Sequence, residues 1–388
     1  MCENLIGEEA IRILLGDPTI VSMVPSDNQI CKTFPLNWAC REGYKETAHV
    51  LLEMPLIDPN VSDANGFCAI DYASVMEELD VVELLLQHDR VDPSVYDNSV
   101  IRWTCAYGLT DVVELLLEHP RVNPSALNSI ALSFASENGF IDIVEILLDD
   151  PRVDPSLLDN YPVQLASQYG HTDVVELLLQ QFRVDPSDNS NCSIREASKN
   201  GHVDVVDLLL QDPRVDPSAN DNDAICFASM NGHTGIVQSL LQDSRVDPSA
   251  VDDFPLQLAS KHGHADIVQL LLEDGRADPS DVNNNAIRYA SDNGHADIVK
   301  LLLQDPRVDP SAFNNSICIA SQNGYTDIVR LLLEDSRVDP SFDDNYAIIS
   351  ASMNGYHDVV DLLLKDSRVD MTRTALVRNR RKEQLAAE

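Results

Sequence analysis

Apolar and polar positions along the chain follow a helical spacing that returns every 31 residues over most of its length. The stretch from Ser280 to Ser311 shows one period. Within it, Ile287, Ala290 and Ser291 lie at i, i+3 and i+4 and predict a short helix with a narrow face of small residues. Gly294 ends this helix, because glycine tolerates the left-handed conformation that closes many helices.

The same period predicts a second helix and defined ends for both helices. Asn284 and Asn285 precede the first helix and are its expected N-caps, since their side chains can accept from unpaired backbone amides. Asp297 opens the second helix, whose apolar arc over 298–303 is broad enough to need neighbours on several sides, and Pro306 prevents its continuation. Neither short helix is stable alone in water, so stacking of the periods must bury their open faces in one core.

The period is marked by the string RVDPS or a close variant, which defines the organisation of the chain. It occurs at intervals of 31 residues, the last interval being 30, and ends at Ser94, Ser125, Ser156, Ser187, Ser218, Ser249, Ser280, Ser311 and Ser341. We interpret residues 30–371 as an array of about eleven repeats. Residues 1–29 are then an N-terminal cap segment, and residues 372–388 a basic C-terminal cap or tail.

The motif A-S-x-N-G-H-x-D-I-V-x-L-L-L resembles the ankyrin repeat, which carries A-A-x-x-G-H-x-x-V-V-x-L-L-L in the same order. The resemblance implies a mainly α fold, an ankyrin-type helical-hairpin solenoid with short β-hairpin or loop fingers. Two departures leave the form of the fingers open. The T-P-L-H opening of the family is best approximated only at Phe34–Asn37, and the repeat is about two residues short, with D-N where the family often has a glycine. The second repeat also has Glu77-Glu78 in place of Gly-His, which predicts a distorted turn there.

The charge of the chain restricts its partners. The formal net charge is −37, with only 27 Lys and Arg. Duplex nucleic acid and anionic membranes need clustered cations, so we expect neither as a partner. A basic protein would be attracted by such a field. The alternative interpretation is that the charge only keeps a long array soluble.

Cysteine usage and the chain ends indicate an intracellular protein. The eight cysteines form no C-x-x-C pair, which argues against a zinc site or a disulfide framework. The acidic N-terminal stretch does not match a signal peptide, and no apolar run is long enough to span a membrane. We therefore expect a cytoplasmic protein. The basic residues Arg378, Arg380, Arg381 and Lys382 belong to a frayed capping helix or, alternatively, to a nuclear-import signal.

We interpret the polar residues that recur in most repeats as structural rather than catalytic or metal-binding. Five histidines follow the turn glycine in one column: His171, His202, His233, His264 and His295. Adjacent repeats lie about 8–10 Å apart, too far for one metal ion to bind two of these rings, so we predict that they bond the turns. The aspartates that open the second helices and those of RVDPS recur in most repeats, whereas catalysis needs one constellation. The arginines of RVDPS are predicted to pair with these acids along the stack.

The sequence indicates neither a catalytic site nor a cofactor. It has no nucleophile elbow, phosphate-binding loop or dinucleotide fingerprint, and no calcium-loop pattern. The expected catalytic residues, metal ligands and cofactors are therefore none, and the chain is not expected to be an enzyme.

One variable column of the first helices is the candidate binding surface. It lies two residues after the recurrent aliphatic, and so about 200° around the helix from it, in a direction that points away from the second helix. The candidate partner-binding residues in it are Trp38, Tyr72, Trp103, Phe134, Phe227 and Tyr289. Aromatic side chains often anchor interfaces, but they could instead pack sideways between neighbouring first helices.

These observations, with the resemblance, predict a monomeric protein-binding scaffold or adaptor that holds a partner, possibly basic, in a concave groove. The alternatives are an acidic protein that sequesters a basic partner by charge mimicry and a non-catalytic subunit of an enzyme complex.

Overall fold

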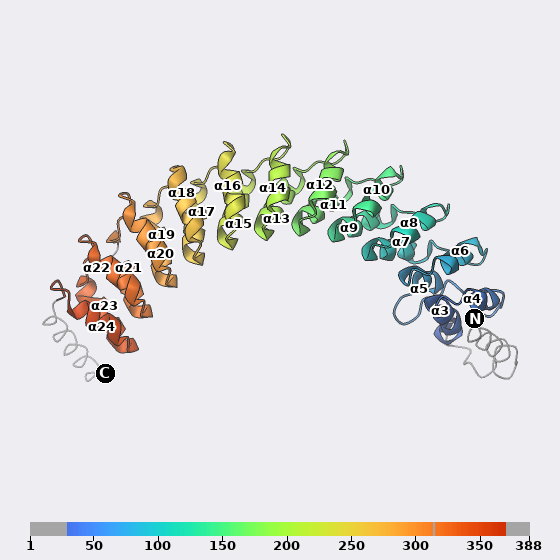
Figure 1. Ribbon diagram of the computed structural model, residues 1–388, viewed down its shortest axis with the longest axis horizontal. Helices are drawn as coiled ribbons and strands as arrows, with labels where there is room; N and C mark the ends of the chain where they lie inside the picture. The colour runs from blue at the N-terminus through green and yellow to red at the C-terminus, as the bar shows by residue number, and fades with distance from the viewer. Residues whose placement is uncertain (1–28, 313–314, 370–388) are drawn as a thin grey trace, which may run out of the picture. The chain divides into compact units, whose positions relative to one another are not determined.

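The computed structural model describes residues 29–312 and 315–369 (Figure 1). The chain divides into two compact halves, an N-terminal half, Met1–Asn189, and a C-terminal half, Ser190–Glu388. The described residues form helices, turns and loops, without a strand. Over these residues the mainly α prediction is confirmed, and the fingers are loops rather than β-hairpins. The predicted cap segment 1–29, save its last residue, and the basic tail 372–388 lie outside the described residues.

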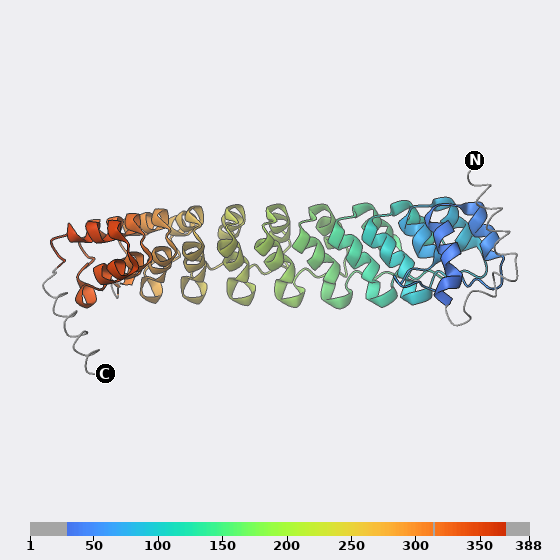
Figure 2. The same ribbon diagram turned by 90° about the horizontal axis from the view of Figure 1, so that it is seen from below.

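Within each half, every repeat contributes two helices, and like helices of successive repeats lie side by side (Figures 1 and 2). The first helices are α3(Gln29–Arg41), α5(Ala69–Val75), α7(Val95–Tyr107), α9(Ala126–Asn138) and α11(Leu157–Tyr169) in the N-terminal half, then α13(Asp188–Asn200), which crosses the boundary, α15(Ala219–Asn231), α17(Ala250–His262), α19(Asp281–Asn293), α21(Asn315–Asn323) and α23(Phe342–Asn354). The second helices are α4(Lys45–Leu52), α6(Leu79–Gln87), α8(Thr110–Leu117), α10(Ile141–Asp149) and α12(Thr172–Leu179) in the N-terminal half, then α14(Val203–Leu210), α16(Thr234–Gln242), α18(Ala265–Asp274), α20(Ala296–Gln304), α22(Thr326–Glu334) and α24(His357–Leu364).

The core of each half lies between its rows of first and second helices. In the repeat from Ser280 to Ser311, Ile287 and Ala290 of α19 are buried, as are Ile298, Val299 and Leu302 of α20. Each fully buried aliphatic side chain contributes about 1.5–3 kcal/mol relative to an exposed one. The predicted apolar periodicity of both helices is therefore confirmed.

Most first helices open with a left-handed turn that the sequence did not lead us to expect. Val282, Asn283 and Asn284 have φ of 45°, 58° and 61°, a conformation that costs a non-glycine residue about 1–2 kcal/mol. Three successive residues with positive φ form the same turn in other repeats, where the turn begins at Tyr96, Leu127, Leu158, Asn189, Asn220, Val251 and Asp343. The expectation that Asn284 and Asn285 are N-caps is wrong, because Asn284 lies inside this left-handed turn.

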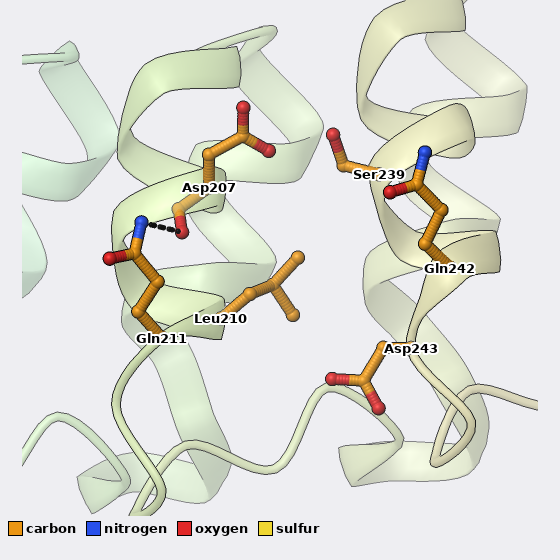
Figure 3. Close-up of a pocket in the computed structure, with 6 residues that line it drawn as sticks. All are labelled: Asp207, Leu210, Gln211, Ser239, Gln242 and Asp243. Atoms are coloured by element: carbon orange, nitrogen blue, oxygen red, sulfur yellow. Dashed lines mark hydrogen bonds between the residues drawn. The ribbon is translucent and has the colours of Figure 1, made fainter.

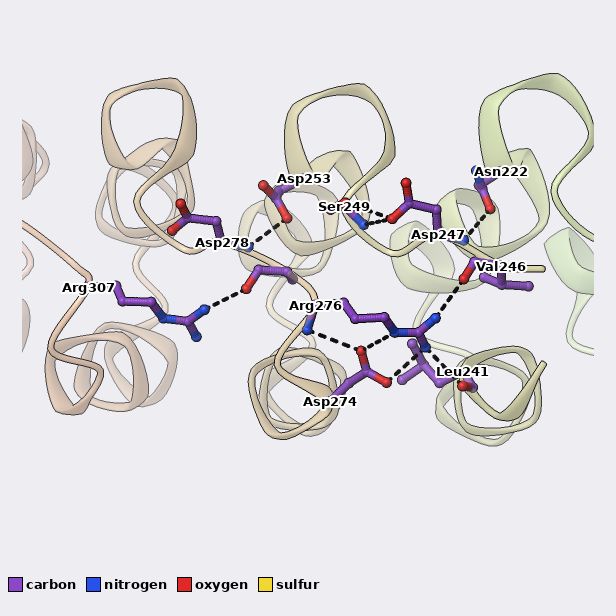
Figure 4. Close-up of polar contacts among 11 residues, drawn as sticks. Asn222, Leu241, Val246, Asp247, Ser249, Asp253, Asp274, Arg276, Asp278 and Arg307 are labelled. Carbon is purple, nitrogen blue, oxygen red and sulfur yellow. Dashed lines mark hydrogen bonds and ion pairs between the residues drawn. The ribbon is translucent and has the colours of Figure 1, made fainter. Parts of the chain in front are cut away.

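The third residue of the left-handed turn binds the loop of the following repeat. Asn284 Oδ1 accepts from the Asp309 backbone amide at 2.7 Å, and Asn222 Oδ1 accepts from the Asp247 amide at 2.8 Å (Figure 4). The column is buried, so each bond satisfies a polar group that would otherwise cost about 1–3 kcal/mol. These bonds between repeats offset part of the strain of the left-handed residues.

The turn between the two helices closes with a left-handed residue in the second repeat as it does in the others. Gly294 has φ 84°, and the His295 amide donates to the Ala290 carbonyl at 2.9 Å. In the second repeat Glu77 takes the glycine position with φ 58°, and the Glu78 amide donates to the Ala73 carbonyl, also at 2.9 Å. The predicted distortion is wrong, because Glu77 adopts the conformation of the glycine it replaces.

Replacing Glu77 with glycine is expected to stabilise the N-terminal half by about 0.5–1 kcal/mol, because glycine adopts positive φ without a steric penalty. Thermal unfolding of the full chain measures this gain as a higher melting temperature of the transition in which the N-terminal half unfolds. Glu77→Ala removes the same charge but keeps the strain, so it should give no gain. A stabilisation by Glu77→Ala equal to that by Glu77→Gly would show that charge, not conformation, is responsible.

Candidate protein-binding surface

The histidine column bonds the repeats together through the turns. Nε2 of His171 lies 2.8 Å from the Glu137 carbonyl oxygen, and His233 and His264 make the same contact with the Lys199 and Met230 carbonyls at 3.0 Å. Each contact reaches back to the last turn of the preceding first helix, where carbonyls lack helical partners. The prediction that these histidines bond the turns is confirmed for these residues and for His295.

The arginine of RVDPS ties its loop to the preceding repeat in a different way from the predicted one. Arg276 Nε lies 2.7 Å from Asp274 Oδ1, while its Nη1 and Nη2 donate to the carbonyls of Val246 and Leu241 at 2.7 and 2.9 Å (Figure 4). The hydrogen bond from Arg276 lowers the pKa of the Asp274 carboxyl. Arg152, Arg214, Arg245, Arg307, Arg337 and Arg368 pair likewise with the aspartate two residues earlier.

Pairing of these arginines along the stack is therefore wrong for most repeats, because a nearer carboxylate lies in the same loop. It holds at two arginines that lack that aspartate. His119 and Gln181 take its place before Arg121 and Arg183. These two arginines lie 3.9 and 3.6 Å from Asp92 and Asp154, the RVDPS aspartates of the preceding repeats.

The described thiols are poorly suited to nucleophilic chemistry. Burial raises the pKa of Cys226 to about 12 and that of Cys318 to about 11, and it raises the pKa values of Cys40, Cys68 and Cys105 as well. A thiol acts as a nucleophile only as the thiolate, so these side chains behave as small core residues. No helix in the described part of the chain is long and apolar enough to cross a membrane.

A shallow, open groove lies between the second helices α14 and α16 of the C-terminal half (Figure 3). Its volume is about 580 Å³, and it is lined by Asp207, Leu210, Gln211, Ser239, Gln242 and Asp243. Ser239 occupies a position where α14 carries Leu208, so a short side chain deepens the space between the helices. The lining is mostly polar and strongly open to solvent, which does not match the enclosed apolar pockets that bind small molecules.

In the N-terminal half, the variable column forms a partly exposed aromatic row. Tyr72, Trp103 and Phe134 are half-buried on α5, α7 and α9. Phe67, in the loop before α5, lies between two of them, with ring centroids 5.4 Å from Tyr72 and 5.5 Å from Trp103. Trp38 on α3 is exposed. Sideways packing thus covers part of these rings, and part stays exposed.

In the C-terminal half, the same column is covered by lysines of the preceding repeat. Lys199 Nζ lies 5.9 Å from the ring centroid of Phe227, and Lys261 Nζ lies 5.9 Å from that of Tyr289. Both aromatic residues are half-buried. The six predicted residues are therefore not equivalent, since intramolecular cation–π contacts occupy the last two.

The sequence reading missed a second set of surface residues, four positions after the variable column. Asn138, Asn231 and Asn293 hold this position in three repeats, and each side-chain amide donates to the carbonyl four residues earlier at 2.9–3.0 Å. Met76, directly after α5, and Tyr107 on α7 occupy it and are 47% and 53% exposed, and Tyr169 on α11 is 47% exposed. Residues at i and i+4 share a helix face, which is the signal that could have revealed them.

Comparison with known proteins agrees with this architecture. The family model described as "Ankyrin repeats (3 copies)" matches residues 2–97, 150–221, 225–314 and 312–375. The ankyrin repeat-containing protein C6C3.08 of Schizosaccharomyces pombe is 32% identical over 97 residues, which cover 24% of this chain and 39% of that protein. The chain therefore matches well under half the length of this relative. Since the family model covers most of the sequence, the chain belongs to the ankyrin-repeat family, whose repeats are protein–protein interaction modules and generally not catalytic.

Proposed function

We propose that this protein is a non-enzymatic scaffold or adaptor that binds a partner protein on the face formed by its first helices. The observation that supports this proposal is the row of half-buried aromatic side chains Tyr72, Trp103 and Phe134, on the successive first helices α5, α7 and α9. Large aromatic residues supply most of the binding free energy at many interfaces. The hydrogen bonds that join successive repeats hold the row in place, which lowers the ordering cost of binding.

A basic partner is supported by the net charge of −37, and we propose that the protein acts as a monomer in the cytoplasm or, if residues 378–382 direct import, in the nucleus. Charge also favours a second candidate function, sequestration of a basic protein by an acidic surface. Exposed acid pairs such as Asp111 with Glu114 on α8, and Asp142 with Glu145 on α10, support this candidate. Their position on the second helices separates the two candidates in an experiment.

A photo-crosslinking amino acid placed at Phe134 is expected to capture a partner, whereas the same group at Glu145 should not. Trp103→Ala is expected to weaken binding of that partner by about 10-fold or more, since truncation of an aromatic anchor typically costs 2 kcal/mol or more. The binding titration is repeated at low and high salt, with Ile141→Ala, an exposed apolar residue of α10, as the control. Crosslinking only at Glu145, with binding abolished by salt and insensitive to Trp103→Ala, would favour charge-based sequestration instead.

A further inference from the structure

We propose that the first-helix face of the N-terminal half binds a basic amphipathic segment of another protein, which places a lysine or arginine side chain over the ring of Phe134 and apolar side chains against Trp103 and Tyr107. This inference rests on the proposed function and names the chemistry of the partner. It is carried by a difference between repeats within the same chain.

The C-terminal half shows the contact in intramolecular form. Lys199 lies over the Phe227 ring and Lys261 over the Tyr289 ring, each lysine belonging to the preceding first helix, 28 positions before the aromatic residue. A cation within about 6 Å of a ring centroid is attracted by the negative face of the ring. The repeat geometry therefore already presents its aromatic column to cations from that side.

The N-terminal half lacks those lysines. The residue 28 positions before Phe134 is Ala106, and the residue 28 positions before Trp103 is Val75. Further along the same column, Glu137 stands where a later repeat carries Lys199. No cation–π contact is found at Trp103 or Phe134 among the residues that the structure describes. At Phe134, the position that a lysine fills in the C-terminal half thus holds only the short side chain of Ala106, which leaves this ring without an intramolecular cation.

Exposed apolar side chains adjoin these rings in the N-terminal half. Met76 and Tyr107, about half exposed, replace the hydrogen-bonded asparagines of other repeats, and the Tyr107 ring stacks on Trp103 with centroids 6.2 Å apart. Contiguous exposed apolar surface of this kind is usual at interaction sites. Neighbouring helices lie about 8–10 Å apart, so a partner helix that crosses them meets a new apolar patch about every five to seven residues, which a heptad repeat can match. The expected segment therefore combines heptad-spaced apolar residues with lysine or arginine between them.

The test uses the full-length chain and three synthetic peptides of about 20 residues, which span about 30 Å as helices. The first carries leucine at heptad positions and lysine between them; the second replaces the lysines with glutamates, and the third replaces the leucines with serines. The chain has two tryptophans, so Trp103 fluorescence in a Trp38→Phe background reports contact at this face. We expect the leucine–lysine peptide to change Trp103 emission and to bind at least about 10-fold more tightly than either other peptide.

Two variants carry residues that other repeats already hold at the same positions, so both should fold. Ala106→Lys is expected to cover the Phe134 ring from within and to weaken peptide binding about 3- to 10-fold. Tyr107→Asn should weaken it about 10-fold. Met353→Asn, at a 75% exposed position of the C-terminal half, is the control and should have no effect, and far-UV circular dichroism checks that each variant is folded.

The inference is overturned if the leucine–lysine peptide does not bind, if the serine–lysine peptide binds equally well, or if neither Ala106→Lys nor Tyr107→Asn weakens binding. The proposed function fails separately. A partner crosslinked at Phe134 and sensitive to Trp103→Ala, but indifferent to Ala106→Lys, leaves the scaffold function standing and removes only the basic-segment chemistry.

Discussion

Replacing Gly232 with alanine is expected to destabilise the C-terminal half by about 2–3 kcal/mol, the sum of a backbone penalty and a lost hydrogen bond. Gly232 has φ 81°, which an alanine adopts only with strain. A Cβ there would lie 2.7 Å from Cε1 of His264. The ring cannot move away freely, because its Nε2 is bound to the Met230 carbonyl at 3.0 Å. Urea unfolding of the full chain, followed by circular dichroism, measures the loss as a lower midpoint.

Two comparisons separate the backbone penalty from the clash. Gly275 has φ 80° but no atom within 4 Å of its would-be Cβ, so Gly275→Ala should cost only about 1 kcal/mol. In a His264→Ala background, Gly232→Ala should cost no more than that. If Gly232→Ala and Gly275→Ala are equally destabilising in the native background, the histidine does not constrain the glycine as the structure implies.

The role of the Gly-His pair could be predicted from the sequence only in part. Its recurrence predicted a turn, and the physics of positive φ predicted the glycine. The sequence could not predict that each histidine packs against the preceding repeat, as His264 packs against Gly232. That contact depends on the distance between stacked hairpins. The aromatic residues Phe140 and Tyr325 fill the same space against Gly108 and Gly294, which a histidine motif alone does not reveal.

The left-handed turn that opens most first helices was the element least predictable from the sequence. Asn and Asp are enriched among residues with positive φ, and pairs such as Asp221-Asn222 carried that signal, but their preference for N-caps offered an equally good local explanation. Valines such as Val282 carry no such signal, and the hydrogen bond that Asn284 Oδ1 accepts from the following loop, which helps to hold the conformation, is not visible in the sequence. The prediction that the RVDPS arginines pair along the stack was wrong because a local contact was overlooked. The sequence suggested distant acids, while the nearest carboxylate lay two residues away.

The candidate surface was found only in part. Periodicity placed Trp103 and Phe134 on a variable column, but their sequence positions look the same as those of Phe227 and Tyr289. Whether a ring is open or covered depends on a side chain 28 positions earlier, Ala106 for Phe134 and Lys199 for Phe227. Such pairs become visible only when the repeats are stacked.

Replacing Asp253 with asparagine is expected to stabilise the protein by about 1–2 kcal/mol above pH 7 and to have little effect near pH 4. Asp253 is the buried third residue of its left-handed turn, a position that holds asparagine in most repeats. Burial, with the nearby carboxylates of Asp281 and Asp278, raises the pKa of Asp253 to about 6. Its Oδ1 accepts from the Asp278 amide at 2.8 Å, a bond that an asparagine oxygen would keep (Figure 4).

The direction of this pH dependence of stability follows from proton binding to Asp253. The folded protein holds the Asp253 proton more tightly than the unfolded chain, so this group's contribution to stability is full below about pH 4 and is lost as pH rises through about 6. Asparagine has no proton to lose, and its amide can donate to Asp281 as the amide of Asn160 donates to Asp188 at the same place in an earlier repeat. Thermal unfolding at a series of pH values should show the two melting temperatures diverging between about pH 4 and 7. Asp252→Asn removes the same charge from an exposed neighbouring position, and it should give no such divergence. A constant difference between Asp253→Asn and the native protein across this range would mean that the buried carboxyl does not titrate as its surroundings require.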